Sequence, residues 1–232
     1  MDQQSVKTTK PTPKVEPAQG QSRRRVRKPK RPKTYHHGSL RETMLQAAER
    51  LLEHHGIQGL TLRAAAREAG VSHAAPKTHF GDMTGLLSEL AAVGFERFVA
   101  TMQVHVRESD PPDQRMAAIG RGYVTFARTH PDLFLLMFRS ERLDMMRPAL
   151  RDAVAASSRV LSGAVGAVRD ENLQLALTLP QAASVVRAWS LVHGFTMLLL
   201  DCRLKPLLAR LPPNTDADDL LTAILDPKQP KR

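Results

Sequence analysis

Apolar residues recur at intervals of three and four along most of this chain, and glycine or proline interrupts the pattern repeatedly. The spacing is typical of helices that bury one face, and no Asn-Gly or Asp-Gly hairpin turn appears. Only 4% of the residues are aromatic, so strand-forming clusters are scarce. We therefore predict an all-α fold. The expected helices cover about 40–56, 62–69, 73–80, 83–107, 112–129, 131–138, 144–169, 180–203 and 216–225.

Positive charge is concentrated in the N-terminal segment. Residues 1–33 hold 11 Lys or Arg against two acidic residues, while the formal net charge of the whole chain is +11. The segment is rich in proline and nearly free of large apolar side chains, so we predict a disordered basic tail. Such a tail attracts a polyanion, either nucleic acid or an anionic membrane surface, or it only aids solubility.

The other global features suit a cytoplasmic protein. The single cysteine, Cys202, excludes an internal disulfide framework and fits a reducing compartment. The polar N-terminus has no signal-peptide pattern. The longest apolar run, Ala188 to Leu200, is shorter than the roughly 20 residues that a membrane span needs. We expect a soluble protein without a membrane partner.

The stretch 61–80 carries the most specific pattern in the chain. Ala65 and Ala66 would let two short helices cross closely, and Gly70 tolerates the positive φ that a tight bend requires. Ser72 would cap the second helix. This is the pattern of a helix-turn-helix, in which the second helix enters the DNA major groove. Plain helix packing is the alternative interpretation of the same alanines.

Residues 35–90 resemble the DNA-binding domain of the TetR family of bacterial transcription regulators. The likeness runs from Tyr35-His36-His37-Gly38-Ser39-Leu40, through the Gly-Val-Ser turn, to Thr78-His79-Phe80. A later segment, Trp189-Ser-Leu-Val-His193-Gly194, resembles the Trp…His-Gly element found in the C-terminal domain of one branch of the family.

The resemblance implies a domain organisation. After the disordered basic tail, 1–33, we expect a three-helix helix-turn-helix DNA-binding domain over 34–82. A helical dimerisation and ligand-binding domain would follow over 83–232. No enzymatic activity is implied.

The resemblance and the helical geometry together assign DNA contacts. Alanine and threonine can touch a thymine methyl, and histidine can bond a purine edge. The residues expected at the bases are His73, Ala74 and Thr78, with Ala75 beside them. Phosphate contacts are expected from Thr61, Arg63, Ser72, Lys77 and His79, the last of which is equally well interpreted as structural. Candidates for an adjacent minor groove are the tail residues Arg23, Arg24, Arg25 and Arg27.

Three positions depart from the family pattern or from local rules. Lys77 stands where the family usually has tyrosine, and it can still reach a phosphate as a flexible cation. Met83 stands where the family usually has lysine and cannot make that contact. Pro76 falls near the fourth position after Ser72, where its missing N–H would favour a 3₁₀-like start.

The C-terminal half is implied to form a homodimer and to sense a small molecule. The helix over 180–203 is apolar on nearly every side, and pairing with its symmetry mate would cover it, with Gly194 allowing a close crossing. Nine aromatic, methionine and histidine residues are candidates to line a ligand pocket, and each can also be interpreted as plain core. These residues are Phe98, Met102, Tyr123, Phe126, Phe134, Met137, Phe138, Trp189 and His193.

We expect a sequence-specific transcription regulator that binds double-stranded DNA at the nucleoid, a repressor released by a small apolar ligand. The alternative is a ligand-independent or architectural DNA-binding protein dominated by its tail. A helical enzyme is disfavoured because no acid–base or nucleophile cluster is visible. His36-His37 and His54-His55 are adjacent pairs rather than i,i+4 pairs, so we expect no metal site, and no cofactor.

Overall fold

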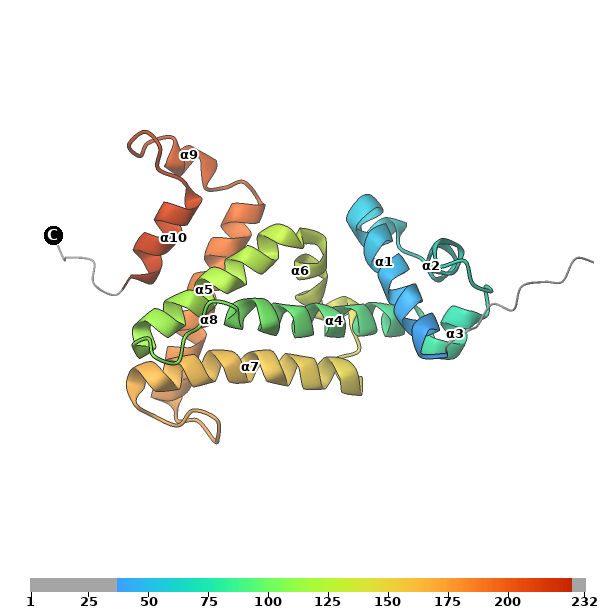
Figure 1. The fold of residues 1–232 in the computed structure, drawn as a ribbon, viewed down its shortest axis with the longest axis horizontal. Coiled ribbons are helices and arrows are strands. Elements are labelled where there is room, and N and C mark those ends of the chain that lie inside the picture. The colour runs from blue at the N-terminus through green and yellow to red at the C-terminus, as the bar shows by residue number, and fades with distance from the viewer. Residues whose placement is uncertain (1–36, 227–232) are drawn as a thin grey trace, which may run out of the picture. The chain divides into compact units, whose positions relative to one another are not determined.

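The described part of the chain, residues 37–226 of this computed structural model, consists of helices, turns and loops without a strand (Figure 1). The expected basic tail, with Arg23, Arg24, Arg25 and Arg27, lies outside the described residues. Within the described part, the all-α prediction is confirmed.

Three helices form the N-terminal part: α1 (His37–Gly59), α2 (Leu62–Glu68) and α3 (Ala75–Phe80). The first was expected to stop at Gly56. That glycine has φ +63° and ψ −177°, so the regular helix is interrupted there before one further turn. Contacts join α1 to α2 and α2 to α3.

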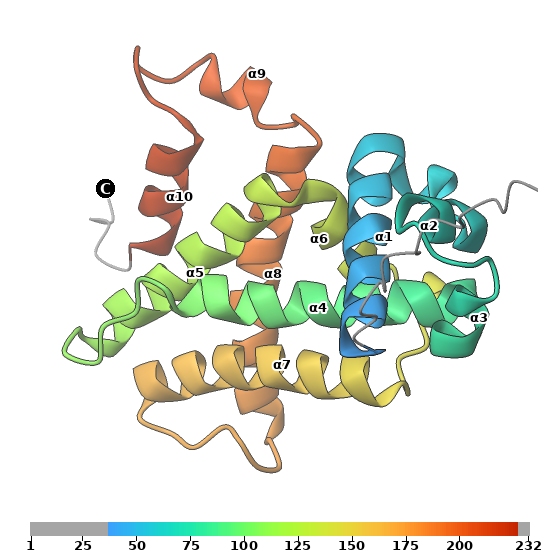
Figure 2. The ribbon, with the colours of Figure 1, turned by 45° about the vertical axis from the view of Figure 1, so that its right-hand side comes forward.

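Helix α4 (Met83–Gln103) is the central element of the remaining helices. It begins where Asp82 accepts a hydrogen bond from the Gly85 N–H at 2.8 Å, a standard N-cap. Figures 1 and 2 show α5 along one side of α4 and α7 along the other, with α8 crossing behind. The elements after α4 are α5 (Pro112–Thr129), α6 (Pro131–Met137), the 3₁₀ turn η1 (Ser140–Arg142), α7 (Pro148–Arg169), α8 (Leu179–Leu200), α9 (Lys205–Leu208) and α10 (Ala217–Leu225).

Proline sets where several of these helices begin. The helix expected from residue 144 begins instead at Pro148, because proline suits the first helical turn and pushes the residue before it out of the helix. The fourth expected helix ends at Gln103 rather than near 107. The short α9 was not expected.

One hydrophobic core runs through the described helices. It includes Met44 and Leu52 of α1, Leu90 of α4, Phe126 of α5 and Leu221 of α10, all nearly inaccessible to solvent. The core therefore crosses the expected domain boundary after residue 82, so α1 to α3 and the later helices pack as one body.

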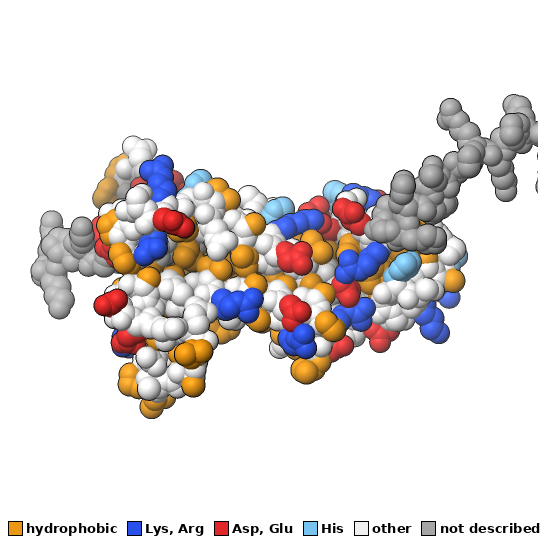
Figure 3. Space-filling model, turned by 60° about the horizontal axis from the view of Figure 1, so that its bottom comes forward, with side chains coloured by type: hydrophobic (Ala, Val, Ile, Leu, Met, Phe, Trp, Pro, Cys, Tyr) orange, Lys and Arg blue, Asp and Glu red, His pale blue; other side chains and the backbone are white. Residues whose placement is uncertain are grey.

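Helix α8 is poorly covered. Only Val192, Phe195 and Thr196 are buried, whereas Val186 is 54% exposed and Leu198 is 47% exposed. Among the described residues it is the one helix long and apolar enough to cross a membrane, by length and composition alone. Figure 3 shows exposed hydrophobic side chains over this face, more of them toward the end away from α1 to α3, with charged side chains of both signs on both halves.

Candidate DNA-reading helix and effector cavity

The turn between α2 and α3 has the expected geometry. Thr61 caps α2, its hydroxyl accepting a hydrogen bond from the Ala64 N–H at 3.1 Å. Gly70 has φ +66°, the left-handed region that only glycine adopts readily. The next N–H, of Val71, donates to the carbonyl of Ala66 at 3.0 Å and fixes the bend. The predicted positive φ at Gly70 is confirmed.

The start of α3 corrects one prediction. Ser72 was expected to cap this helix, but the helix begins at Ala75, and the N-cap position is held by Ala74, which makes no side-chain hydrogen bond. The reason is Pro76, whose missing N–H is harmless only in the first turn of a helix. Ahead of it, the Ala75 N–H donates to the Ser72 carbonyl at 3.1 Å, a three-residue bond of the 3₁₀ type.

The candidate base-reading residues mostly face solvent. His73 and Ala74 are exposed in the turn before α3, and Thr78 is exposed within it. The Thr78 hydroxyl donates to the Ala74 carbonyl at 3.3 Å, which leaves its methyl and an oxygen lone pair available. Ala75 is half-buried and packs against the core.

The candidate phosphate-binding residues surround that exposed surface. Thr61, Arg63, Ser72 and Lys77 are exposed, while His79 is half-buried. The ring beside His79, that of Phe80, is only 2% exposed and belongs to the core. The exposed positions all lie on or next to α2 and α3.

An ion triad lies behind α3. Glu89 of α4 has a nearly buried side chain and accepts hydrogen bonds from Arg41 of α1 and from the Nε of Arg147 at 2.6 Å. Arg147 also lies 3.5 Å from the carbonyl of Phe80, the last residue of α3. Gly85 makes this packing possible, since a Cβ there would lie 1.9 Å from the same carbonyl oxygen. The end of α3 is thus held directly by the residue that precedes α7.

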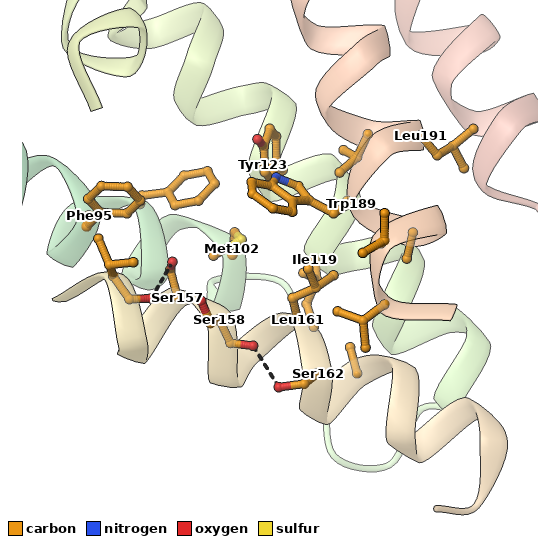
Figure 4. A pocket seen from close by; sticks show the side chains of 18 of the residues that line it. Phe95, Met102, Ile119, Tyr123, Ser157, Ser158, Leu161, Ser162, Trp189 and Leu191 are labelled. Carbon is orange, nitrogen blue, oxygen red and sulfur yellow. Dashed lines mark hydrogen bonds between the residues drawn. The ribbon is translucent and has the colours of Figure 1, made fainter. Parts of the chain in front are cut away.

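A cavity of about 570 Å³ lies between α4, α5, α7 and α8. Figure 4 shows Phe95 and Met102 on one side, Tyr123 and Trp189 above, and the serines of α7 below. The volume falls within the usual range for small-molecule sites. The residues lining the cavity include Phe95, Phe98, Met102, Met116, Ile119, Tyr123, Met137, Phe138, Val154, Ser157, Ser158, Leu161, Ser162, Val185, Trp189, Val192 and Leu225.

A polar pair stands at one wall of this cavity. The Tyr123 hydroxyl and the Nδ1 of His193 are 2.7 Å apart, and the Trp189 ring lies 6.4 Å from the His193 ring. Burial raises the pKa of Tyr123, and burial lowers the pKa of His193 below its usual 6.5. Both groups are therefore neutral at pH 7, and one hydrogen bond joins the phenol oxygen to the imidazole, its direction set by the imidazole tautomer.

One cluster among the described residues could hold a metal ion. Ligand atoms of Glu49 and Glu53 on α1 and of His130, between α5 and α6, lie within 4.8 Å of one another. Arg97 already pairs with Glu49, which supplies part of the positive charge that a cation would bring. The sequence pattern did not indicate this cluster, because His130 comes from the junction of α5 and α6, far from α1 in the sequence.

Two family models match the chain. Residues 44–90 match the model described as bacterial regulatory proteins of the tetR family, and residues 116–226 match the model of a tetracyclin repressor-like C-terminal domain. The chain belongs to the TetR family. No curated protein is similar enough in sequence to count as a match.

Solved structures share this TetR-family fold. A protein of unknown function from Rhodococcus sp. RHA1 is 34% identical, covering 83% of this chain and 95% of its own, with a TM-score of 0.66. The TetR family regulator PfmR from Thermus thermophilus is 17% identical over 78% and 94% of the two chains, with a TM-score of 0.52. The regulator FadR from Bacillus subtilis, solved in complex with stearoyl-CoA, is 13% identical over 79% and 95%, with a TM-score of 0.58.

Six of the nine residues expected in the pocket of this TetR-family protein line the cavity. They are Phe98, Met102, Tyr123, Met137, Phe138 and Trp189. Phe126 and Phe134 are fully buried in the core instead. His193 does not line the cavity and stands behind it, bonded to Tyr123.

Sequence reasoning missed the serine wall of α7. Ser157, Ser158 and Ser162 line the cavity of this TetR-family chain from a helix that was interpreted only by its apolar spacing. The available signal was that these hydroxyls interrupt the apolar run from Val154 to Val165, where a fully packed face would carry larger apolar groups.

Proposed function

We propose that this TetR-family protein is a sequence-specific DNA-binding repressor that a small apolar ligand releases from its operator. The observation that carries the proposal is the exposed surface on and before α3, where His73, Ala74 and Thr78 stand free beside a turn built on Gly70. A helix presented in this way can enter a major groove. The family domains favour a regulator over an enzyme.

In this proposal His73 and Ala74 contact the first bases from the turn, and Thr78 contacts the next from α3. Because α3 begins at Ala75, the base contacts come from its N-terminal end and from the two residues ahead of it. Thr61, Arg63, Ser72, Lys77 and His79 contact phosphates, and Ala75 stands beside the base-reading residues. The tail arginines Arg23, Arg24, Arg25 and Arg27 add contacts to the backbone or minor groove.

The operator-binding form is a homodimer that pairs through α8. Exposed apolar side chains on this helix, including Val186, Leu191 and Leu198, support that assignment. A Cβ on Gly194 would meet no other atom of the protomer, so this position has room for a second helix. Two copies place two recognition helices on successive major grooves and read a palindrome.

The ligand acts by shifting the population of conformations. The cavity is bounded by α4 and α7. Glu89 of α4 pairs with Arg147, which directly precedes α7 and lies 3.5 Å from the carbonyl of Phe80 at the end of α3. A ligand that binds better to a state with altered α4–α7 packing would change the spacing of the recognition helices. FadR, which has the same fold, was solved with stearoyl-CoA, and this likeness supports an effector site in the helical body.

Selection from a random double-stranded DNA library at physiological salt, followed by sequencing of the bound pool, tests the proposal. We expect a palindrome whose half-sites lie about one helical turn apart. Bound but unenriched DNA would instead favour the architectural alternative, in which the basic tail dominates affinity.

Two variants refine this test. His73→Ala should change the preferred half-site, and an unchanged preference would remove His73 from the base contacts. Deletion of residues 1–33 should flatten the salt dependence of binding while leaving the preferred sequence intact, since each phosphate contact contributes a slope of about −0.9.

A further inference from the structure

The walls of the cavity carry no charge among the residues that the structure describes. Phenylalanine, methionine, leucine, isoleucine and valine make most of the lining, and the polar members are serines, Tyr123 and the Trp189 indole. No Lys, Arg, Asp, Glu or His lines it. An ion that entered would therefore lose its hydration without meeting a counter-charge.

The titratable groups at the cavity wall add no charge to it near pH 7. Tyr123 is buried and hydrogen-bonded to His193, and burial holds both groups in their neutral forms near pH 7. Transfer of an unpaired carboxylate, phosphate or ammonium ion into such surroundings is far more costly than transfer of a hydroxyl.

The serines give one wall a definite polarity. The Ser157 hydroxyl donates to the Val154 carbonyl at 3.0 Å, and the Ser162 hydroxyl donates to the Ser158 carbonyl at 2.7 Å (Figure 4). Their protons are used by their own helix, so their oxygens face a ligand as acceptors. The α7 wall therefore favours a ligand that donates hydrogen bonds.

We propose that the cavity takes an uncharged, mostly apolar ligand with hydroxyl groups along one edge, and that it rejects carboxylates, phosphates and ammonium ions. This inference rests on the proposed ligand-responsive function and names the chemistry of its effector. It separates this chain from a regulator whose ligand is an acyl-CoA, because the lining holds no cation to meet the ligand's phosphates.

Arg115 is the cation that would let the cavity bind an anion if a ligand could reach it. Its Nε is buried without a hydrogen-bond partner, and it lies one helical turn before the cavity residue Ile119 on α5. It does not line the cavity. An anion that reached it would show as carboxylate binding that Arg115→Met abolishes.

The full-length protein contains a single tryptophan, Trp189, and this residue lines the cavity, so its fluorescence reports occupancy directly. The matched probes are 1-decanol, decanoate and decyltrimethylammonium at pH 8, below their aggregation concentrations, with calorimetry as a second readout. We expect 1-decanol to bind at least tenfold more tightly than either ion, and 1,2-decanediol to bind more tightly still.

Ser158→Lys provides the reversal test. Ser158 is exposed at the cavity wall, so the variant should keep the wild-type melting temperature and shift the preference from 1-decanol toward decanoate. Equal or tighter binding of an ion to the wild type, or no binding of 1-decanol up to its solubility, would overturn the inference. DNA selection without any probe tests the regulator function separately, so failure of one is not failure of the other.

Discussion

Glu89 is the residue that most tightly joins distant parts of this molecule. Its carboxylate receives one guanidinium from α1 and another from the start of α7, and its side chain is only 10% exposed. A nearly buried carboxylate between two arginines is fully satisfied, but removal of its charge leaves the two guanidinium groups facing each other. The triad is therefore most sensitive at its centre.

Glu89→Gln preserves shape and removes that charge. We expect the free energy of unfolding to fall by roughly 2–3 kcal/mol, less than for a fully buried pair because Arg41 is 45% exposed. Urea denaturation measures the change. As a matched control, Glu68→Gln breaks the exposed pair with Arg50 and should cost no more than about 0.5 kcal/mol. Similar losses for the two variants would contradict a special role for Glu89.

His193 makes stability depend on pH. Since burial lowers its pKa in the folded state, the unfolded chain takes up a proton first as the pH falls. The contribution of this residue is complete above pH 6.5 and is lost progressively between that value and its lower folded pKa, at no more than about 1.4 kcal/mol per pH unit. Melting temperatures from pH 8 to 5 should fall less steeply for His193→Asn than for the wild type. Parallel curves would argue against this assignment.

At the scale of elements, the contact between α3 and α4 fixes how the recognition helix is presented. Gly85 lies in the first turn of α4, directly against the carbonyl of Phe80. Because no atom can be added there without moving one helix, this small residue determines how closely α3 approaches α4.

Gly85→Ala should separate the two helices. The added Cβ would lie 1.9 Å from the Phe80 carbonyl oxygen and 2.9 Å from Arg147 Nη1, and we expect a loss of roughly 2–4 kcal/mol in stability. Operator affinity should fall as well in gel-shift titrations. In the control Gly163→Ala, on the exposed side of α7, the Cβ meets only the Gln174 side chain and should gain up to about 1 kcal/mol. A stable, fully active Gly85→Ala protein would contradict this account.

Local sequence patterns predicted the elements better than the way they meet. The cap at Thr61, the bend at Gly70 and most helix spans follow from neighbouring residues, so they were predictable. The pairing of Arg147 with Glu89 and the contribution of α7 serines to the cavity depend on tertiary packing. For the same reason, the spacing of the large aromatic residues did not indicate which of them lie in the core and which line the cavity.

At the scale of the whole molecule, one protomer leaves α8 incompletely covered. A soluble protein that exposes several large apolar groups on one helix usually buries them against a partner. Gly194 lies on this helix with open space beside it. The protomer is thus suited to pairing at this position.

Gly194→Leu separates folding from dimerisation. Within the protomer the new side chain meets no neighbour at its Cβ, and leucine is the better helix former, so the helical content should be retained. We expect the sedimentation coefficient to change from that of a dimer to that of a monomer, with at least a tenfold loss of operator affinity. The control Gly163→Leu places the same side chain on exposed α7 and should remain dimeric. A Gly194→Leu protein that still sediments as a dimer would move the interface away from this crossing.

The arginine that holds the end of α3 also bears on how such proteins can be recombined. Arg147 comes from beyond the DNA-reading helices, yet it contacts Phe80 at the end of α3 and Glu89 on α4. A chimera that takes its DNA-reading helices from one regulator and its sensing helices from another would inherit the two sides of this contact from different parents. The transplantable unit is therefore larger than the helix-turn-helix, and a functional graft has to carry Arg41, Glu89 and Arg147 together.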